Sequence, residues 1–153
     1  MPKGSSGIDI DDRFNLNLKD YKVIKHDLNL MRMPFKDDQF DTLLCSHVLE
    51  HLNSPHITLN EFKRIVKPNG IIILAVPNAR CIFTDFYKGE WAKYHINVWD
   101  YHTFKVFLEV HNIRIIRFLV NHPTKNMLVG KLFQLIPFKI RWEDIWFVCK
   151  NIK

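Results

Sequence analysis

The hydrophobic positions of this chain fall into short runs separated by polar stretches that contain proline, glycine or asparagine. Runs that are rich in Ile, Val, Leu and Phe have the length of β-strands, and they lie at residues 7–11, 21–25, 40–45, 71–76, 113–120 and 145–149. Acidic residues bound the compact run at 40–45, which is typical of a strand buried on both faces. The pattern therefore predicts several short strands of the kind found in α/β proteins.

Helical spacing follows the third of these runs. Ser54 is a suitable N-cap, and Pro55 suits the first helical position. The apolar residues then recur at helical spacing, at Leu59, Phe62 and Val66. We expect the Pro-Asn-Gly sequence at 68–70 to end this helix before the strand at 71–76.

A second helix is expected after Asp100, whose carboxylate suits an N-cap. Its apolar side repeats at Phe104, Phe107, Leu108 and His111. A third, short helix is expected within 126–135. Strands separated by helical crossovers predict an open, mostly parallel α/β sheet of the Rossmann-like kind. The last two strands, with no full helix between them, predict an antiparallel edge. We treat 1–153 as a single domain.

Charge and cysteine content narrow the classes of function. The net charge is +6, and the half from residue 77 onward carries it, with 12 Lys and Arg residues against 6 Asp and Glu, and 15 of the 20 aromatic residues. Such a half could face an anionic partner, although a solvated basic surface over an aromatic core is the simpler interpretation. No basic run is dense enough to favour a nucleic-acid partner. The three scattered cysteines fit reduced thiols in the cytoplasm, and we see neither a secretory signal nor an apolar run long enough to span a membrane.

Several motifs occur in a characteristic order. They are Asp27-Leu28, the stretch 33–41 with its Pro-Phe and Phe-Asp pairs, Ser46-His47-Val48-Leu49-Glu50-His51-Leu52, the stretch 61–70, and Val76-Pro77-Asn78. This succession resembles the class I S-adenosylmethionine (SAM) methyltransferases, over roughly residues 7–120. The later His95, followed by Trp99-Asp100, is similar to a histidine near the lid of that family. The resemblance implies a Rossmann-like fold, SAM as cofactor, and methyl transfer to an unidentified acceptor, for which anionic and aromatic molecules are both open.

The resemblance assigns six cofactor-binding residues, namely Asp9, Ile10, Asp27, Leu28, Ser46 and His47. Asp9 would accept both ribose hydroxyls, a role suited to a carboxylate, while Ile10 packs on the adenine. Asp27 would receive the adenine amino group, and the Leu28 N–H would meet a ring nitrogen. The turn at Ser46 and His47 would line the methionine portion. The competing interpretation is that the two aspartates only shape turns and that the residues near 46–51 only cap and pack.

Methyl transfer is an SN2 displacement that needs a base only when the acceptor must lose a proton. The candidates for such a base are His47, Tyr94 and His95. Residues 47–51 also match the His-x-x-Glu-His pattern of a class of zinc peptidases. The Asn-Ser-Pro sequence that follows would interrupt the long helix of such a site, and we therefore expect no metal ligands.

One family feature has no counterpart here. The Gly-x-Gly-x-Gly turn that normally cradles the cofactor's carboxylate end does not follow a strand in this sequence, since Gly4 and Gly7 lie beside Met1. We therefore expect an N-terminally shortened version of the fold, in which the neighbours of the absent central strand have unpaired edges. A shortened product, a strand supplied by a second copy or a partner chain, and a non-catalytic binding or scaffold protein all remain open. A nucleic-acid-binding module is a further alternative that we do not favour.

Overall fold

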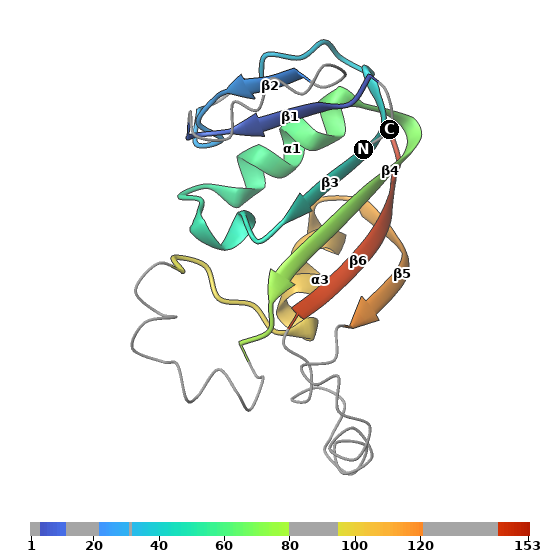
Figure 1. Ribbon diagram of the computed structural model, residues 1–153. Coiled ribbons are helices and arrows are strands. Elements are labelled where there is room, and N and C mark those ends of the chain that lie inside the picture. The colour runs from blue at the N-terminus through green and yellow to red at the C-terminus, as the bar shows by residue number, and fades with distance from the viewer. Residues whose placement is uncertain (1–3, 12–21, 31, 80–94, 121–143) are drawn as a thin grey trace, which may run out of the picture.

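The computed structural model describes residues 4–11, 22–30, 32–79, 95–120 and 144–153 (Figure 1). The elements follow in the order β1 (Ser6–Asp9), β2 (Lys22–Lys25), β3 (Phe40–Ser46), the one-turn 3-10 helix η2 (Leu49–His51), α1 (Pro55–Ile65), β4 (Val66–Pro77), α3 (Tyr101–Val110), β5 (Ile113–Val120) and β6 (Asp144–Asn151). The helix expected within 126–135 lies outside the described residues.

The strands form two hydrogen-bonded groups. Strands β1 and β2 pair in parallel, and the second group has the order β3-β4-β6-β5. In that group β3 and β4 are parallel, whereas β6 runs antiparallel to both β4 and β5. The predicted fold class, a mostly parallel Rossmann-like α/β sheet with an antiparallel edge, is confirmed.

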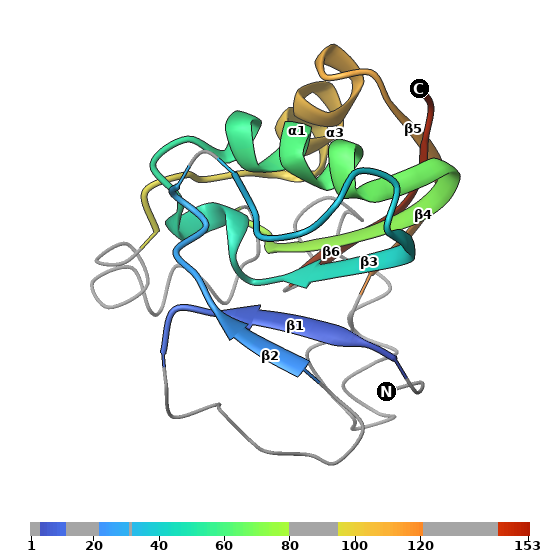
Figure 2. The ribbon, with the colours of Figure 1, turned by 90° about the horizontal axis from the view of Figure 1, so that it is seen from above.

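Strands β1 and β3 lie side by side in both views, and β1 to β4 all point the same way (Figures 1 and 2). Among the described strands, however, β1 is hydrogen-bonded only to β2, and β3 only to β4. The sheet is thus divided between β1 and β3. This is also the point where the strand order reverses, because the chain moves from β1 outward to β2 and then from β3 outward to β4.

Helices α1 and α3 both cover the same face of the larger sheet (Figure 2). Strand β6 shows this directly, because its residues alternate between buried and half-buried positions. The buried set points under the helices and consists of Ile145, Phe147, Cys149 and Asn151. These side chains join Leu59 and Phe62 of α1 and Phe104 and Leu108 of α3 in one hydrophobic core.

The prediction that residues 40–45 are buried on both faces is wrong. Cys45 is 7% exposed, but Leu44, its neighbour on β3, is 63% exposed. Successive side chains of a strand point to opposite faces, and the described helices cover only one of them. Strand β3 therefore buries one face alone.

The prediction that the Pro-Asn-Gly sequence ends the first helix is also wrong. The helix ends at Ile65, and β4 begins at once with Val66, so the three residues lie inside the strand. Asn69 adopts a left-handed conformation with φ 64°. A Cβ on Gly70 would lie 2.6 Å from Val66 Cγ1 and 2.9 Å from the Asp41 carbonyl oxygen. The sequence that suggested a helix stop instead builds an irregular, closely packed start to a strand, where only glycine fits.

The two predicted helix starts are confirmed in position. Ser54 and Pro55 occupy the N-cap and first helical positions of α1, although the Ser54 side chain makes no capping hydrogen bond. Asp100 forms a complete capping box, since its Oδ1 accepts from the Thr103 N–H at 2.9 Å while Thr103 Oγ1 accepts from the Asp100 N–H at 2.9 Å. Within the described part of the chain, no helix combines the length and the apolar character needed to cross a bilayer.

Candidate functional site

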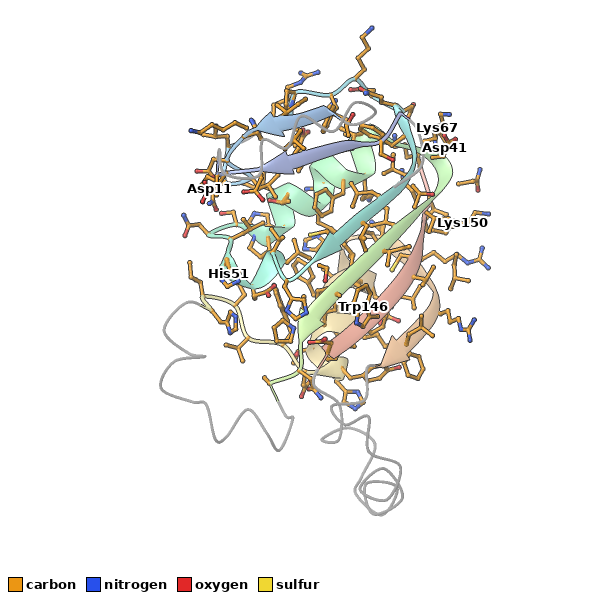
Figure 3. The ribbon with its side chains drawn as sticks, in the orientation of Figure 1. Asp11, Asp41, His51, Lys67, Trp146 and Lys150 are labelled. Carbon is orange, nitrogen blue, oxygen red and sulfur yellow. The ribbon has the colours of Figure 1, made fainter. Side chains whose placement is uncertain are left out.

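The carboxyl ends of the parallel strands meet along one side of the molecule. Asp9 ends β1, and Asp27 follows the end of β2 by two residues. The two ends are tied together by the backbone N–H of His26, which donates to the Asp9 carbonyl at 2.9 Å. Figure 3 shows Asp11 and His51 on this side, and the amino end of β3 at the other. The structure thus brings the two predicted adenosine-binding acids to the same end of adjacent strands.

Both aspartates also shape the turns that follow them. Asp9 Oδ1 accepts from the Asp11 N–H at 2.8 Å, and Asp27 Oδ1 accepts from the Asn29 N–H at 2.8 Å and from its side-chain amide at 3.0 Å. The turn-forming role that competed with the ligand role is therefore present for each residue. Ile10, the residue after Asp9, is 64% exposed.

His47 stands immediately beyond β3 in a strained conformation. Its φ is 55°, a region that non-glycine residues seldom adopt, and its N–H donates to the Ala75 carbonyl at 3.0 Å. The side chain lies between two acids, with Nδ1 3.6 Å from Glu50 Oε1 and Nε2 3.3 Å from Asp144 Oδ1. The backbone of β3 and β4 thus fixes a histidine whose two ring nitrogens both face carboxylates.

Glu50 is the buried centre of this region. The residue is 1% exposed, and burial raises the pKa of its carboxyl group, opposed by the nearby His51 and His47. His51 Nε2 lies 3.8 Å from Glu50 Oε1, and the rings of His51 and His95 have centroids 4.8 Å apart. Burial, together with the two neighbouring histidines, lowers the pKa of His95. At neutral pH this imidazole is therefore uncharged and able to accept a proton.

Asn97 holds the two parts of this region together. Its N–H donates to the Glu50 carbonyl at 2.9 Å, and its side-chain amide donates to the carbonyls of Leu52 at 2.6 Å and Leu49 at 3.3 Å. These bonds fasten the stretch around His95 to the 3-10 helix η2. The position of His95 beside His51 is consequently set by backbone contacts rather than by its own side chain alone.

Residues 5–74 match the sequence profile of a family described as a methyltransferase domain. This stretch contains β1, β2, β3 and α1 and most of β4, including the strand ends just described. The matched stretch is just under half of the 153 residues, and over it the chain is similar to this methyltransferase family.

Curated proteins match parts of this chain. The uncharacterised protein MJ0638 of Methanocaldococcus jannaschii is 34% identical over 97 residues, which are 62% of this chain and 42% of that protein. The demethylmenaquinone methyltransferase of Streptomyces griseus is 39% identical over 71 residues, which are 46% of this chain and 27% of that enzyme. The chain thus matches less than half the length of each of these relatives.

Solved structures show the same methyltransferase fold. A SAM-dependent methyltransferase from Archaeoglobus fulgidus superposes with a TM-score of 0.70, covering 95% of this chain and 75% of that one. The sequence identity between them is 18%, so the likeness concerns the fold.

The structure brings some predicted site residues together and adds others. Ser46 ends β3, His47 follows it and lies close to Glu50, and His95 lies beside His51, whereas Tyr94 lies outside the described residues. Sequence reasoning missed the roles of Asn97 and Asp144, because both come from segments far from 46–51 in sequence. Glu50 was considered only as a residue that caps or packs after β3 and as part of the zinc-peptidase pattern that we did not favour. The signal available was a glutamate within an apolar stretch, with Leu49 immediately before it and Leu52 two residues after it.

Proposed function

We propose that this protein transfers the methyl group of SAM to an acceptor that is still unidentified. The observation that carries the proposal is that the carboxyl ends of β1, β2 and β3 lie on one side of the molecule, at the point where the strand order reverses (Figures 1 and 2). Open α/β sheets bind their ligands outside the carboxyl ends of the strands at such a reversal. The match of residues 5–74 to a methyltransferase domain supports SAM as that ligand.

The adenosine part would lie against the ends of β1 and β2. Asp9 would accept the ribose hydroxyls and Asp27 the adenine amino group, as charge-assisted hydrogen bonds. The exposed side chain of Ile10 offers an apolar surface for the adenine ring, and the Leu28 N–H would meet a ring nitrogen. These roles supplement the turn-forming bonds that both acids make through Oδ1.

The sulfonium end would lie at Ser46 and His47, beyond β3. The acceptor atom attacks the methyl carbon, and the electron pair of the broken carbon–sulfur bond stays on sulfur. The protein's contribution is to align the two molecules and exclude water. His95, uncharged at neutral pH, suits the role of base for an acceptor that must lose a proton. His47 is the weaker candidate, because both its ring nitrogens face carboxylates; Tyr94 also stays a candidate.

We further propose that the protein works in the cytoplasm. The described cysteines, Cys45 and Cys149, are free and buried, as is common in a reducing compartment.

Calorimetric titration of the 153-residue chain with SAM and with S-adenosylhomocysteine tests the cofactor assignment. The variants Asp9→Asn and Asp27→Asn keep an oxygen that can form the local turn and remove only the negative charge. Asp41→Asn is the matched control, since Asp41 is exposed and lies at the opposite end of β3 (Figure 3).

We expect micromolar binding that each site variant weakens about tenfold or more, the loss of a charge-assisted hydrogen bond, and that the control leaves unchanged. A folded chain that binds neither compound would overturn the proposal for these residues, in favour of a non-catalytic protein. Equal weakening by all three variants would assign the effect to general charge.

A further inference from the structure

A buried carboxylate to which no described residue donates a hydrogen bond lies at the centre of the histidine cluster. Neither oxygen of Glu50 has a hydrogen-bond partner among the described residues, and the residue is 1% exposed. The nearest histidine nitrogens, His47 Nδ1 and His51 Nε2, lie 3.6 and 3.8 Å from Oε1, beyond hydrogen-bond distance. Burying a carboxylate without donors is unfavourable by several kcal/mol, so the fold stabilises this arrangement only if something else satisfies it.

Two imidazoles converge on the same point. Glu50 offers a carboxylate oxygen, and His51 and His95 each offer an imidazole nitrogen. These three atoms all lie within 4.8 Å of one another. An ion at the centre of such a triangle would need only small side-chain adjustments to reach the distances of about 2.0–2.2 Å that zinc makes to nitrogen and oxygen. The set of two histidines and one carboxylate is also the donor set of zinc and non-haem iron sites, whereas Mg²⁺ and Ca²⁺ prefer oxygen alone.

Hydrogen bonds from neighbouring residues fix the three candidate ligands relative to one another. Asn97 binds three carbonyls of the stretch 49–52 and so fixes His95 relative to Glu50 and His51. The side chain of His51 is 43% exposed, whereas the side chain of Glu50 is 2% exposed. The cluster therefore has a buried carboxylate on one side and is accessible to solvent on the other. An ion here would retain a coordination position toward solvent, as catalytic metal sites do.

We propose that Glu50, His51 and His95 bind a divalent transition-metal ion of the zinc class. The ion would place positive charge beside the buried carboxylate. An ion bound by His95 would take this histidine out of the role of base, which would then fall to His47 or Tyr94. His47, held between Glu50 and Asp144, would lie beside the ion and orient the carboxylate. The expectation from the sequence that no metal is bound rested on the absence of a long helix carrying both histidines. In the structure, Glu50 and His51 instead lie on the one-turn 3-10 helix η2, and the third ligand, His95, comes from the stretch before α3.

The site is independent of the cofactor assignment, because metal binding can be measured without SAM. The chain is first treated with EDTA and then titrated with Zn²⁺ by calorimetry and with Co²⁺ by visible absorption. We expect one ion per chain, with a dissociation constant in the micromolar range or below. The ligand-field bands of bound Co²⁺ report coordination by protein side chains directly.

Three variants identify the ligands. We expect Glu50→Gln, His51→Ala and His95→Ala each to weaken Zn²⁺ binding at least tenfold and to reduce the Co²⁺ bands. The double variant His56→Ala/His111→Ala is the matched control, since these two rings also stack, with centroids 6.3 Å apart, and it should bind as the parent does. Because Glu50 is buried, its variant could fail to fold, in which case the more exposed His51 carries the test.

Two results would overturn the proposal. One is a folded parent chain that binds neither Zn²⁺ nor Co²⁺ at 100 μM. That concentration is roughly a hundredfold above the largest dissociation constant that we expect for the site. The other is binding that the control removes and the three site variants leave intact. Either outcome would leave the proposed methyl transfer untouched, since that proposal rests on the ends of β1, β2 and β3.

Discussion

Arg64 on α1 connects the helix to the segment that leads from β2 into β3, and replacing it with methionine should destabilise the protein. Its Nε donates to Glu61 Oε1 and its Nη2 to Glu61 Oε2, both at 2.7 Å. Nη1 donates to the Phe35 carbonyl at 2.9 Å, and Nη2 to the Met33 carbonyl at 3.1 Å. Glu61 Oε2 in turn accepts from the Met33 N–H at 2.8 Å. Arg64→Met keeps most of the side-chain volume and removes all of these donors.

The expected loss follows from burial. The side chains of Arg64 and Glu61 are 17% and 13% exposed, so neither is fully in water. A hydrogen bond to a charged group contributes roughly 1.5–3 kcal/mol when buried, and less where solvent screens it. Two such bonds at the lower end of that range, with water replacing part of the carbonyl contacts, give a loss of about 2–4 kcal/mol. Asp37 also accepts from Arg64, but it is exposed and adds nothing to this figure.

Urea denaturation followed by far-UV circular dichroism measures this loss as a lower midpoint at unchanged slope. Lys67→Met is the matched control, because it removes a cation of similar length whose pair with Asp41 lies in solvent, with side chains 47% and 84% exposed. We expect no measurable change for the control. A loss below about 1 kcal/mol for Arg64→Met, or an equal loss in both variants, would refute the inference that burial makes the Arg64 network stabilising.

The effect of Arg64 also depends on pH. Its hydrogen bonds hold the pKa of the Glu61 carboxyl below its ordinary value of 4.5. A carboxylate whose folded pKa is depressed contributes stability that is present above the unfolded pKa and lost as the pH falls through the folded pKa. The stability difference between the parent and Arg64→Met should therefore be constant near pH 7 and shrink below about pH 4.5. A difference that grows on acidification would contradict this assignment.

Three further predictions concern buried groups. Asn151→Ala should cost about 2–3 kcal/mol in urea denaturation, because the completely buried amide donates to the Val66 carbonyl at 2.7 Å and to the carbonyls of Lys63 in α1 and Lys67 in β4; an unchanged midpoint would argue against it. Gly70→Ala should lower the melting temperature, since the new Cβ would lie 2.6 Å from Val66 Cγ1. An unchanged melting temperature would mean that the start of β4 can shift to accommodate the methyl group. Burial raises the pKa of the Cys45 and Cys149 thiols to about 12, so iodoacetamide at pH 8 should label their peptides only after unfolding; native labelling, seen by mass spectrometry, would refute it.

The elements with strong local signals could be predicted from the sequence, and those set by long-range contacts could not. The helix after Asp100 could be predicted because the capping hydrogen bonds of Asp100 are made to residues within the first turn. The prediction that the Pro-Asn-Gly sequence ends a helix was wrong because the same residues suit both the end of a helix and an irregularity in a strand. The choice between them is made by the neighbouring β3, whose Asp41 carbonyl lies against Gly70. The exposure of Leu44 likewise depends on where the helices pack.

The candidate site divides in the same way. The ends of β1 and β3 could be located from strand pattern and family resemblance, because a strand end is a local feature. The meeting of Glu50 with His95 could not, since it depends on the Asn97 bonds that join two segments far apart in sequence. The approach of Asp144 to His47 has the same origin, because β6 reaches that point only through its pairing with β4.

The division of the sheet between β1 and β3 has a consequence for how the molecule opens. No described backbone hydrogen bonds link β1 to β3, so the β1–β2 pair is held to the rest by contacts such as the bond from Thr58 Oγ1 to the Leu28 carbonyl at 3.1 Å. Local opening of that pair need not disrupt the larger sheet. Amide protons of β1 and β2 should therefore exchange with solvent through a lower-energy fluctuation than those of β4 and β6. A ligand that bridges Asp9 and His47 would join two separately cooperative units, and its binding would be seen as slower exchange in β1.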